Sequence, residues 1–385
     1  MRGKDLRNKT IPIRKYIFAG GYLSCNMKKL DILISPTTRC NLRCKYCYVP
    51  KNENDKRATD ISVSDYDCIY KWIAEYSKLI QTEEIRITWF GGEPLLVGAE
   101  YLNKAIELQR KYFTVPTINV VQTNLTILND NIIKLFIDHF NSSIGVSIDI
   151  GTSNRIYSNG KSSAETVEKN IRILQNCGIT TGLVCTLAKN DLADANNVYN
   201  RFKKLGSDFR INMASAPNRT NPDIFPSRSE YEKFILELFK IYLQDESPAG
   251  RFYNFDMMCY LYLKGEKITC VDNSTPEYFI GLEADGRIMS RCRFFKQLGS
   301  YKTDSPNSFL SKIKKATPVF TIPTDCVKCR AFQKVCDGSC IGEPTESCNQ
   351  SRCGYKLETT KTLWDFIFNY MHDNGLEFSS MKEHE

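Results

Sequence analysis

The first half of the chain alternates between short apolar runs and longer segments with hydrophobic residues at helical spacing. Alternating or unbroken short apolar runs predict strands, and apolar residues three and four positions apart predict amphipathic helices. The predicted strands lie at residues 30–35, 85–90, 117–123, 144–150, 180–187 and 209–214. The predicted helices between them lie at residues 61–79, 100–112, 129–140, 163–177 and 193–205.

This alternation predicts βαβ units around a parallel sheet, and hence an α/β fold. Six units rather than eight predict a partial (βα)6 barrel of the TIM type, with its functional site at the carboxyl ends of the strands. After residue 216 the pattern changes to a polar loop, a helix at 231–242, a cysteine-rich region and a closing helix at 359–371. The expected organisation is a 1–27 extension, a 28–216 barrel, a 217–266 bridging helical region, a 267–357 cysteine-rich domain and a 358–385 helix and tail.

Composition excludes several classes of protein. The chain has 385 residues, of which 42% are hydrophobic and 25% are charged, as in ordinary globular domains. No apolar run approaches the roughly 20 residues of a membrane span, and Arg14 and Lys15 interrupt any secretory signal. We therefore expect a cytoplasmic protein without a membrane partner. The net charge is +8 without a block of basic residues, so no nucleic-acid partner is expected, whereas an acidic peptide would suit this balance.

Sixteen cysteines and only three histidines point to thiolate chemistry. Without a secretory signal, metal ligation is favoured over a disulfide framework. Cys40, Cys44 and Cys47 form the run Cys-Asn-Leu-Arg-Cys-Lys-Tyr-Cys after the first predicted strand. A [4Fe–4S] cluster needs four ligands, so three cysteines leave one iron open. Structural zinc, the alternative, usually has four ligands, and no histidine is near.

This run resembles the CxxxCxφC motif of the radical S-adenosylmethionine (SAM) enzymes, with Tyr46 as the aromatic residue φ. The resemblance implies that the open iron binds the amino and carboxylate groups of SAM. It also implies that the reduced cluster cleaves SAM to a 5′-deoxyadenosyl radical, which abstracts hydrogen from a substrate. Gly91, Gly92 and Glu93 are similar to the family's GGEP motif, which holds the amino group of the cofactor. A Gly-Pro turn that merely ends the strand is the alternative.

The resemblance extends to the ends of the third and fourth predicted strands, which are similar to stretches in the sulfatase-maturase and peptide-maturase branches. It implies that Asn124 and Ser147 face the cofactor. Arg155 is the predicted partner of the cofactor carboxylate, because a guanidinium can form two parallel hydrogen bonds with it. An exposed, solvated arginine is the alternative.

The C-terminal cysteines resemble a SPASM domain, a module that carries auxiliary clusters, although two spacings are one residue longer than usual. The implied ligands are Cys270, Cys292 and Cys340 for auxiliary cluster I, and Cys326, Cys329, Cys336 and Cys353 for auxiliary cluster II. Cluster I then has an open iron, or Cys259 or Cys348 closes it. A zinc-ribbon-like module is the alternative. The predicted cofactors are therefore SAM and three [4Fe–4S] clusters.

The leading functional prediction is a radical SAM peptide maturase that abstracts hydrogen from a residue of a ribosomally synthesised precursor peptide. It would install an intramolecular thioether or carbon–carbon cross-link. The alternative is an anaerobic sulfatase-maturating enzyme that oxidises Cys or Ser to formylglycine. That branch usually has an Asp base after the second SPASM cysteine, whereas Arg293 follows Cys292 here. No catalytic base is assigned from the sequence.

Two further partners are expected. The cluster needs a reducing partner such as flavodoxin or ferredoxin. The barrel starts near Lys28, which leaves no room for an N-terminal leader-recognition domain. Leader recognition, where the reaction needs it, would therefore use a separate protein or the surface of the barrel.

Overall fold

The computed structural model describes residues 28–47, 60–150, 154–214, 222–264, 276–290, 297–316 and 357–376. Six parallel strands lie where the pattern predicts them: β1 (Lys29–Ile34), β2 (Glu84–Trp89), β3 (Thr117–Thr123), β4 (Ser143–Ile148), β5 (Thr180–Leu187) and β6 (Asp208–Met213). The helices between them are α2 (Asp65–Leu79), α3 (Ala99–Leu108), α4 (Asp130–His139), α5 (Ala164–Asn176) and α6 (Ala195–Leu205). The predicted α/β sheet is thereby confirmed, and its strand bounds differ from the prediction by at most two residues.

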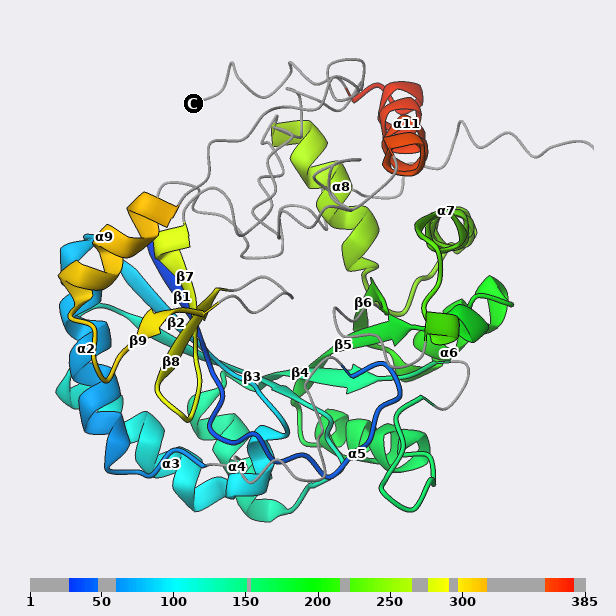
Figure 1. The fold of residues 1–385 in the computed structure, drawn as a ribbon. Helices are drawn as coiled ribbons and strands as arrows, with labels where there is room; N and C mark the ends of the chain where they lie inside the picture. The colour runs from blue at the N-terminus through cyan, green and yellow to red at the C-terminus, as the bar shows by residue number, and fades with distance from the viewer. Residues whose placement is uncertain are drawn as a thin grey trace, which may run out of the picture.

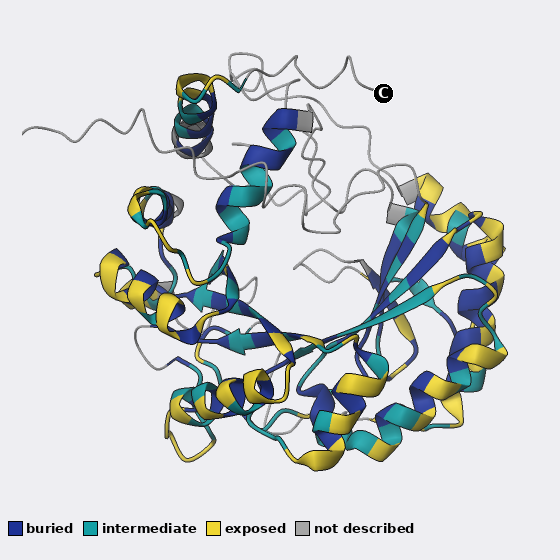
Figure 2. Cartoon of the chain, turned by 180° about the vertical axis from the view of Figure 1, so that it is seen from behind, coloured by how far each residue is buried: buried dark blue, intermediate teal, exposed yellow. Residues whose placement is uncertain are grey.

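The sheet is an open arc with α2 to α6 along its outer face (Figure 1). Burial alternates along the strands, and in β1 the side chains of Leu30, Ile32 and Ile34 are fully buried while their neighbours are partly exposed. Since successive side chains of a strand point to opposite faces, one face of each strand packs against the helices. Figure 2 shows the buried residues between sheet and helices. The side chains that alternate with these buried ones lie on the other, concave face of the sheet.

The sheet continues past β1 with strands that the sequence pattern did not predict. β7 (Phe279–Leu282) pairs in parallel with β1, and β8 (Arg287–Ser290) and β9 (Gln297–Ser300) follow in antiparallel order. Among the described residues the order is β6-β5-β4-β3-β2-β1-β7-β8-β9. These strands belong to the region expected as a separate cysteine-rich domain. Pairing with β7 satisfies the backbone groups that β1 would otherwise expose at an edge.

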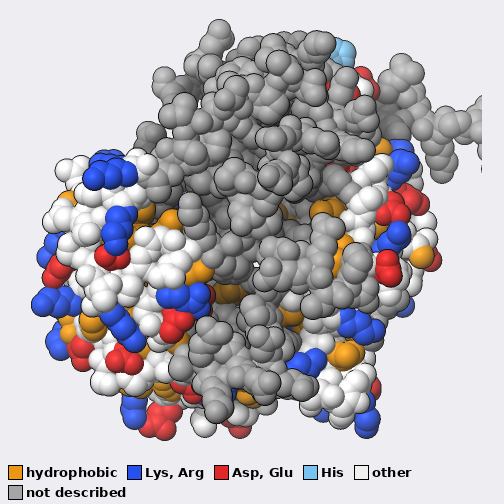
Figure 3. All heavy atoms as spheres, in the orientation of Figure 1, with side chains coloured by type: hydrophobic (Ala, Val, Ile, Leu, Met, Phe, Trp, Pro, Cys, Tyr) orange, Lys and Arg blue, Asp and Glu red, His pale blue; other side chains and the backbone are white. Residues whose placement is uncertain are grey.

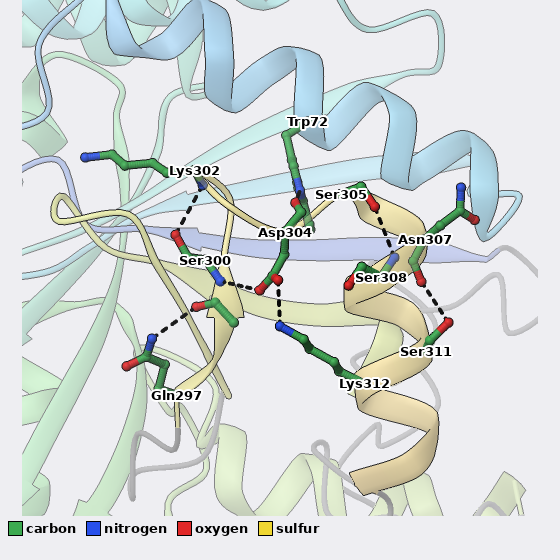
Figure 4. Close-up of polar contacts among 11 residues, drawn as sticks. Trp72, Gln297, Ser300, Lys302, Asp304, Ser305, Asn307, Ser308, Ser311 and Lys312 are labelled. Atoms are coloured by element: carbon green, nitrogen blue, oxygen red, sulfur yellow. Dashed lines mark hydrogen bonds and ion pairs between the residues drawn. The ribbon is translucent and has the colours of Figure 1, made fainter.

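Polar contacts around Asp304 connect the strands β7 to β9 to the barrel (Figure 4). The helix α9 (Pro306–Ala316), also absent from the prediction, packs on α2. Asp304 precedes α9, and its carboxylate accepts hydrogen bonds from the backbone N of Ser300 at 3.0 Å and from Lys312 Nζ at 2.6 Å. Its backbone oxygen accepts from Trp72 Nε1 at 2.8 Å. The ring of Phe309 packs edge-on against Trp72, so apolar and polar contacts meet at the same place.

Helices α7 (Arg228–Gln244), α8 (Tyr253–Lys264) and α11 (Leu357–Asp373) pack together beside β6 (Figure 1). They contain the predicted helices at 231–242 and 359–371, whereas α8 was not predicted as a distinct element. Asn254 of α8 binds the edge of β6: its Oδ1 accepts from the N of Ile211 at 2.8 Å, and its Nδ2 donates to the O of Ile211 at 2.9 Å. The side chain thereby replaces the neighbouring strand that β6 lacks on this side among the described elements.

Lysine and arginine side chains are interspersed with acidic ones on the face drawn in Figure 3. The same mixture of signs occurs in the i,i+4 pairs of Lys104 with Glu100 on α3 and of Lys134 with Asp138 on α4. None of the described helices combines the length and the apolar character that a membrane crossing requires. The predicted extension at 1–27 and the predicted auxiliary-cluster cysteines lie outside the described residues: Cys270, Cys292, Cys326, Cys329, Cys336, Cys340 and Cys353, together with Cys348.

Candidate active site

The loop that follows β1 carries Cys40, Cys44 and Cys47, and we call residues 35–47 the cysteine loop. All three cysteines are partly exposed, and none is in a disulfide. The GGEP segment supports the first half of the loop: the N of Gly92 donates to the O of Thr37 at 3.1 Å, and the N of Glu93 to the O of Arg39 at 2.8 Å.

This contact requires glycine. A Cβ on Gly92 would lie 2.1 Å from the backbone O of Arg39, and Gly91 has a φ of 126° with Ser35 Oγ 2.2 Å from a Cβ position. Neither place can hold a larger residue without moving the backbone of the loop. The structure therefore shows the two glycines closely packed on the cysteine loop, and their predicted place in a cofactor site stays a prediction.

The second half of the cysteine loop is paired with the segment that follows β4. The N of Arg43 donates to the O of Ile156 at 2.6 Å, and the N of Lys45 donates to the O of Asn154 at 2.9 Å. Leu42 and Tyr157 form an antiparallel bridge between the same two segments. The loop is therefore held between the carboxyl ends of β2 and β4.

The donor set of this loop fits an iron–sulfur cluster, with three thiols and no histidine on one short segment. In the described part of the chain no three Cys, His, Asp or Glu side chains are gathered closely enough to hold a metal ion. The three predicted ligands thus share one loop at a strand end, and their ligation of a cluster stays a prediction.

Glu93 lies beside the cysteine loop and is 1% exposed. Its Oε1 accepts hydrogen bonds from Thr123 Oγ1 at 2.6 Å and from the N of Leu95 at 3.0 Å, and its Oε2 accepts from the N of Asn124 at 2.7 Å. Burial raises the pKa of this carboxyl, while the hydrogen bonds and the charge of Arg155 act in the opposite direction. A carboxylate has about four acceptor positions, so one remains for an additional donor such as an ammonium group.

Asn124 joins the same network through its side chain. Its Nδ2 donates to Asn41 Oδ1 at 2.9 Å, and Asn41 Nδ2 donates to Thr126 Oγ1 at 2.8 Å. The end of β3 is thus bound to the cysteine loop on one side and to Glu93 on the other. The structure brings these predicted residues together.

Ser147 lies on β4 with its side chain on the face opposite the buried residues Val146 and Ile148. Gln122 of β3 donates from Nε2 to Ser147 Oγ at 2.8 Å, and a Cβ on Gly145 would lie 2.4 Å from Gln122 Oε1. Since the hydroxyl oxygen accepts this bond, the hydroxyl hydrogen of Ser147 can donate elsewhere. The sequence analysis missed this contact, because it depends on the register in which Gln122 pairs with Gly145.

Tyr46 is 7% exposed and packs against Ala188 and Ala214. Its hydroxyl donates to Asp149 Oδ1 and accepts from Arg155 Nη1 at 3.3 Å. Burial raises the pKa of Asp149 to about 6, although Arg155 and the hydrogen bond from Tyr46 oppose the shift. The alternative of an exposed, solvated Arg155 is wrong, because the residue is only partly exposed and its Nε is buried. The sequence analysis assigned no function to Asp149.

The chain is similar to proteins of known family. Residues 34–200 match the radical SAM superfamily. The cysteine-type anaerobic sulfatase-maturating enzyme of Clostridium perfringens (strain 13 / Type A) is 25% identical over 381 residues, which cover 89% of this chain and 97% of the relative.

Two solved structures have the same fold. The structure of native anSMEcpe with bound AdoMet and Kp18Cys peptide has a TM-score of 0.75 at 21% identity and covers 90% of this chain and 99% of that one. Streptococcus suis SuiB bound to precursor peptide SuiA has a TM-score of 0.55 at 14% identity, covering 82% of this chain and 74% of that one.

The matched superfamily region contains the cysteine loop, the GGEP segment, Asn124, Ser147 and Arg155. It confirms the predicted resemblance and implies SAM and one [4Fe–4S] cluster as cofactors. The curated relative favours the alternative prediction, sulfatase maturation, over the leading prediction of a cross-linking maturase. The chain is a radical SAM enzyme related to the anaerobic sulfatase-maturating enzymes.

Proposed function

We propose that this enzyme modifies a peptide or protein substrate by oxidising a cysteine side chain to formylglycine. The near end-to-end match to a cysteine-type sulfatase-maturating enzyme, over 89% of this chain and 97% of the relative, carries the proposal. A solved structure of the same fold contains a peptide together with AdoMet. The concave face of the sheet is the side on which Ser147 lies, and a substrate approaching there would meet the end of β4.

The described residues support a cofactor site at the ends of β1 to β4. Cys40, Cys44 and Cys47 would ligate the cluster, and the remaining acceptor position of Glu93 suits the amino group of SAM. The free hydroxyl hydrogen of Ser147 suits an oxygen of the cofactor. When bound, SAM and the reduced cluster supply the radical that removes hydrogen from the substrate. The further proposed residues around this site are Tyr46, Gly91, Gly92, Asn124 and Arg155.

The region 267–357 is proposed to hold two auxiliary [4Fe–4S] clusters, with the cysteine ligands that the SPASM resemblance implies. Oxidation of the thiol-bearing carbon to an aldehyde removes two electrons and two protons, while water supplies the oxygen and the sulfur leaves as hydrogen sulfide. Hydrogen abstraction takes one electron with one proton, an auxiliary cluster could accept the second electron, and the second proton passes to solvent. Three clusters correspond to about twelve iron atoms per chain. The remaining proposed partner is an external reductant such as flavodoxin or ferredoxin.

A cross-linking peptide maturase is the second candidate. Arg293 follows Cys292 at the position where the sulfatase-maturating branch usually has an Asp base. The fold is also that of SuiB, which was solved with a precursor peptide. The two candidates differ in their product, so one experiment separates them.

The reduced, anaerobically reconstituted enzyme is incubated with SAM and a peptide that contains one cysteine. Matched peptides have serine or alanine at that position, and the Glu93→Gln enzyme is the control. We expect 5′-deoxyadenosine and, with the cysteine peptide, replacement of the thiol by an aldehyde oxygen that a hydrazide captures. A product that has lost two hydrogens and does not react with hydrazide would identify a cross-link instead. Absence of 5′-deoxyadenosine with every peptide would contradict both candidates.

A further inference from the structure

One group of buried polar residues lies where the cysteine loop meets the segment after β4, and the proposed function gives none of its members a defined contact. Asp149 is 6% exposed and follows the last residue of β4. Its two carboxylate oxygens bind both segments: Oδ1 accepts from the hydroxyl of Tyr46, and Oδ2 accepts from the N of Asn154 at 3.1 Å. One carboxylate therefore connects the cysteine loop to the segment that supports it.

Arg155 completes this arrangement. Its Nη1 donates to the hydroxyl oxygen of Tyr46 at 3.3 Å, and its positive charge interacts with Asp149. A buried carboxylate without a nearby cation is strongly destabilising. The positive charge of Arg155 therefore allows the carboxylate of Asp149 to stay buried next to the hydroxyl of Tyr46.

The other side of the guanidinium faces the helices. The Nε of Arg155 is buried without a hydrogen-bond partner among the described residues. Beside Arg155 is a cavity of about 10 Å³, which Ile148 of β4 and Val167 of α5 also line. This is close to the volume of one water molecule. Both Ile148 and Val167 are buried between sheet and helix. The Nε of Arg155 therefore lies on the helix-covered side of β4, whereas Ser147 lies on the concave face.

The network reaches a third strand end through Asn154. Asn154 Nδ2 donates to Asp191 Oδ2 at 3.1 Å, and the same oxygen accepts from the N of Ala188 at 2.7 Å. Ala188 follows the end of β5 and packs against the ring of Tyr46. The hydroxyl and the ring of Tyr46 are therefore held by one connected set of residues.

We propose that Asp149 and Arg155 are positioning residues that hold Tyr46, and with it the cysteine loop, in place. Arg155 acts through Tyr46, and the carboxylate of the cofactor is bound by another group. The proposal rests on the proposed function only in taking the cysteine loop as the cluster-binding loop. Its test measures hydrogen exchange in the loop and not the reaction product. The proposal can therefore fail although the enzyme is active, and it can hold although the product is not formylglycine.

The test is hydrogen–deuterium exchange of the full-length chain, before and after cluster reconstitution. The reporters are the backbone amides of Arg43 and Lys45, which donate to the segment after β4. The variants are Tyr46→Phe, Asp149→Asn and Arg155→Gln. Tyr157→Phe is the matched control, since it removes a tyrosine hydroxyl from the same pair of segments. Its hydroxyl makes no hydrogen bond among the described residues.

We expect exchange over residues 40–47 and 154–157 to become about ten-fold faster or more in all three variants, as loss of a hydrogen bond to a charged group allows. Tyr157→Phe and the strands β1 and β2 should exchange as in the wild type. Tyr46→Phe removes one oxygen atom only, so it tests the proposal even where Asp149→Asn fails to fold. Unchanged exchange over the cysteine loop in Tyr46→Phe overturns the proposal.

A second measurement separates positioning from direct binding of the cofactor. SAM binding to the reconstituted enzyme is measured for the same variants by equilibrium titration. Positioning predicts that Tyr46→Phe, Asp149→Asn and Arg155→Gln weaken binding to similar extents, and that the Asp149→Asn/Arg155→Gln double variant is less impaired than additivity predicts. Weakened binding in Arg155→Gln alone, with Tyr46→Phe like the wild type, would assign Arg155 to the cofactor and overturn the proposal.

Discussion

The indole Nε1 of Trp72 on α2 donates a hydrogen bond of 2.8 Å to the backbone oxygen of Asp304, 232 residues later in the chain. Two more bonds connect the same parts of the molecule: Tyr76 Oη donates to the O of Glu277, and Tyr278 Oη donates to the O of Ile80, each at 2.9 Å. The strands β7 to β9 therefore continue the sheet of the barrel, and hydrogen bonds connect them and α9 to the outer helix α2.

The first prediction concerns Asp304, whose carboxylate binds Ser300 and Lys312. Asp304→Asn removes the negative charge and should lower the free energy of unfolding by about 1–2 kcal/mol, because it weakens hydrogen bonds to a charged group. Chemical denaturation measures the effect. Asp138→Asn, in an exposed i,i+4 pair on α4, is the matched control and should change stability by less than about 0.5 kcal/mol. Equal effects of the two substitutions would show that Asp304 has no special function in connecting the strands β7 to β9 to the barrel.

The second prediction concerns Gly92. Its Cβ position lies 2.1 Å from the backbone O of Arg39, so Gly92→Ala must displace the cysteine loop. We expect a loss of stability of about 2 kcal/mol or more and reduced iron content after reconstitution, measured by thermal unfolding and iron analysis. Gly182→Ala is the control, because no atom lies within 4 Å of its Cβ position. Normal iron content in Gly92→Ala would contradict the close fit between GGEP and the loop.

The third prediction concerns Glu93. In Glu93→Gln the amide nitrogen cannot accept a hydrogen bond, so either the N of Asn124 loses its acceptor, or Thr123 Oγ1 and the N of Leu95 both do. We expect a loss of stability of about 1–3 kcal/mol and weaker SAM binding by about ten-fold or more, since the negative charge is gone. Thr123→Val removes one of the two donors to Oε1, since the N of Leu95 remains, and it keeps the charge, so it should reduce stability with a smaller effect on binding. Calorimetric titration and thermal unfolding measure the two quantities, and unchanged binding in Glu93→Gln would exclude Glu93 as the acceptor of the ammonium group.

The sequence predicted β1 to β6 because their alternation of buried and exposed residues is long and regular, as in Thr180–Leu187. It missed β7, β8 and β9, which have four residues each and show no period that distinguishes them from loops. In the site, motif spacing located the cysteines, Gly92 and Glu93. It could not locate the contacts of Gln122 with Ser147, or of Tyr46 with Asp149, because these depend on strand register and on the packing of two distant loops.

The last prediction concerns the pH dependence of stability through Asp256 on α8. Burial raises the pKa of this carboxyl to about 7, and the nearby Arg251, which pairs with Asp208, reduces the shift only in part. A carboxyl whose pKa is higher in the folded chain than in the unfolded chain, where it is about 3.9, binds its proton more tightly when folded. Its contribution to stability is therefore complete below about pH 4 and decreases as the pH rises towards 7.

Asp256→Asn cannot lose a proton, so the variant should gain stability relative to the wild type between pH 5 and 8. The gain should be at least about 1.4 kcal/mol, the equivalent of one pKa unit, in denaturation measured at several pH values. Parallel pH profiles for the two proteins would show that Asp256 titrates alike in both states.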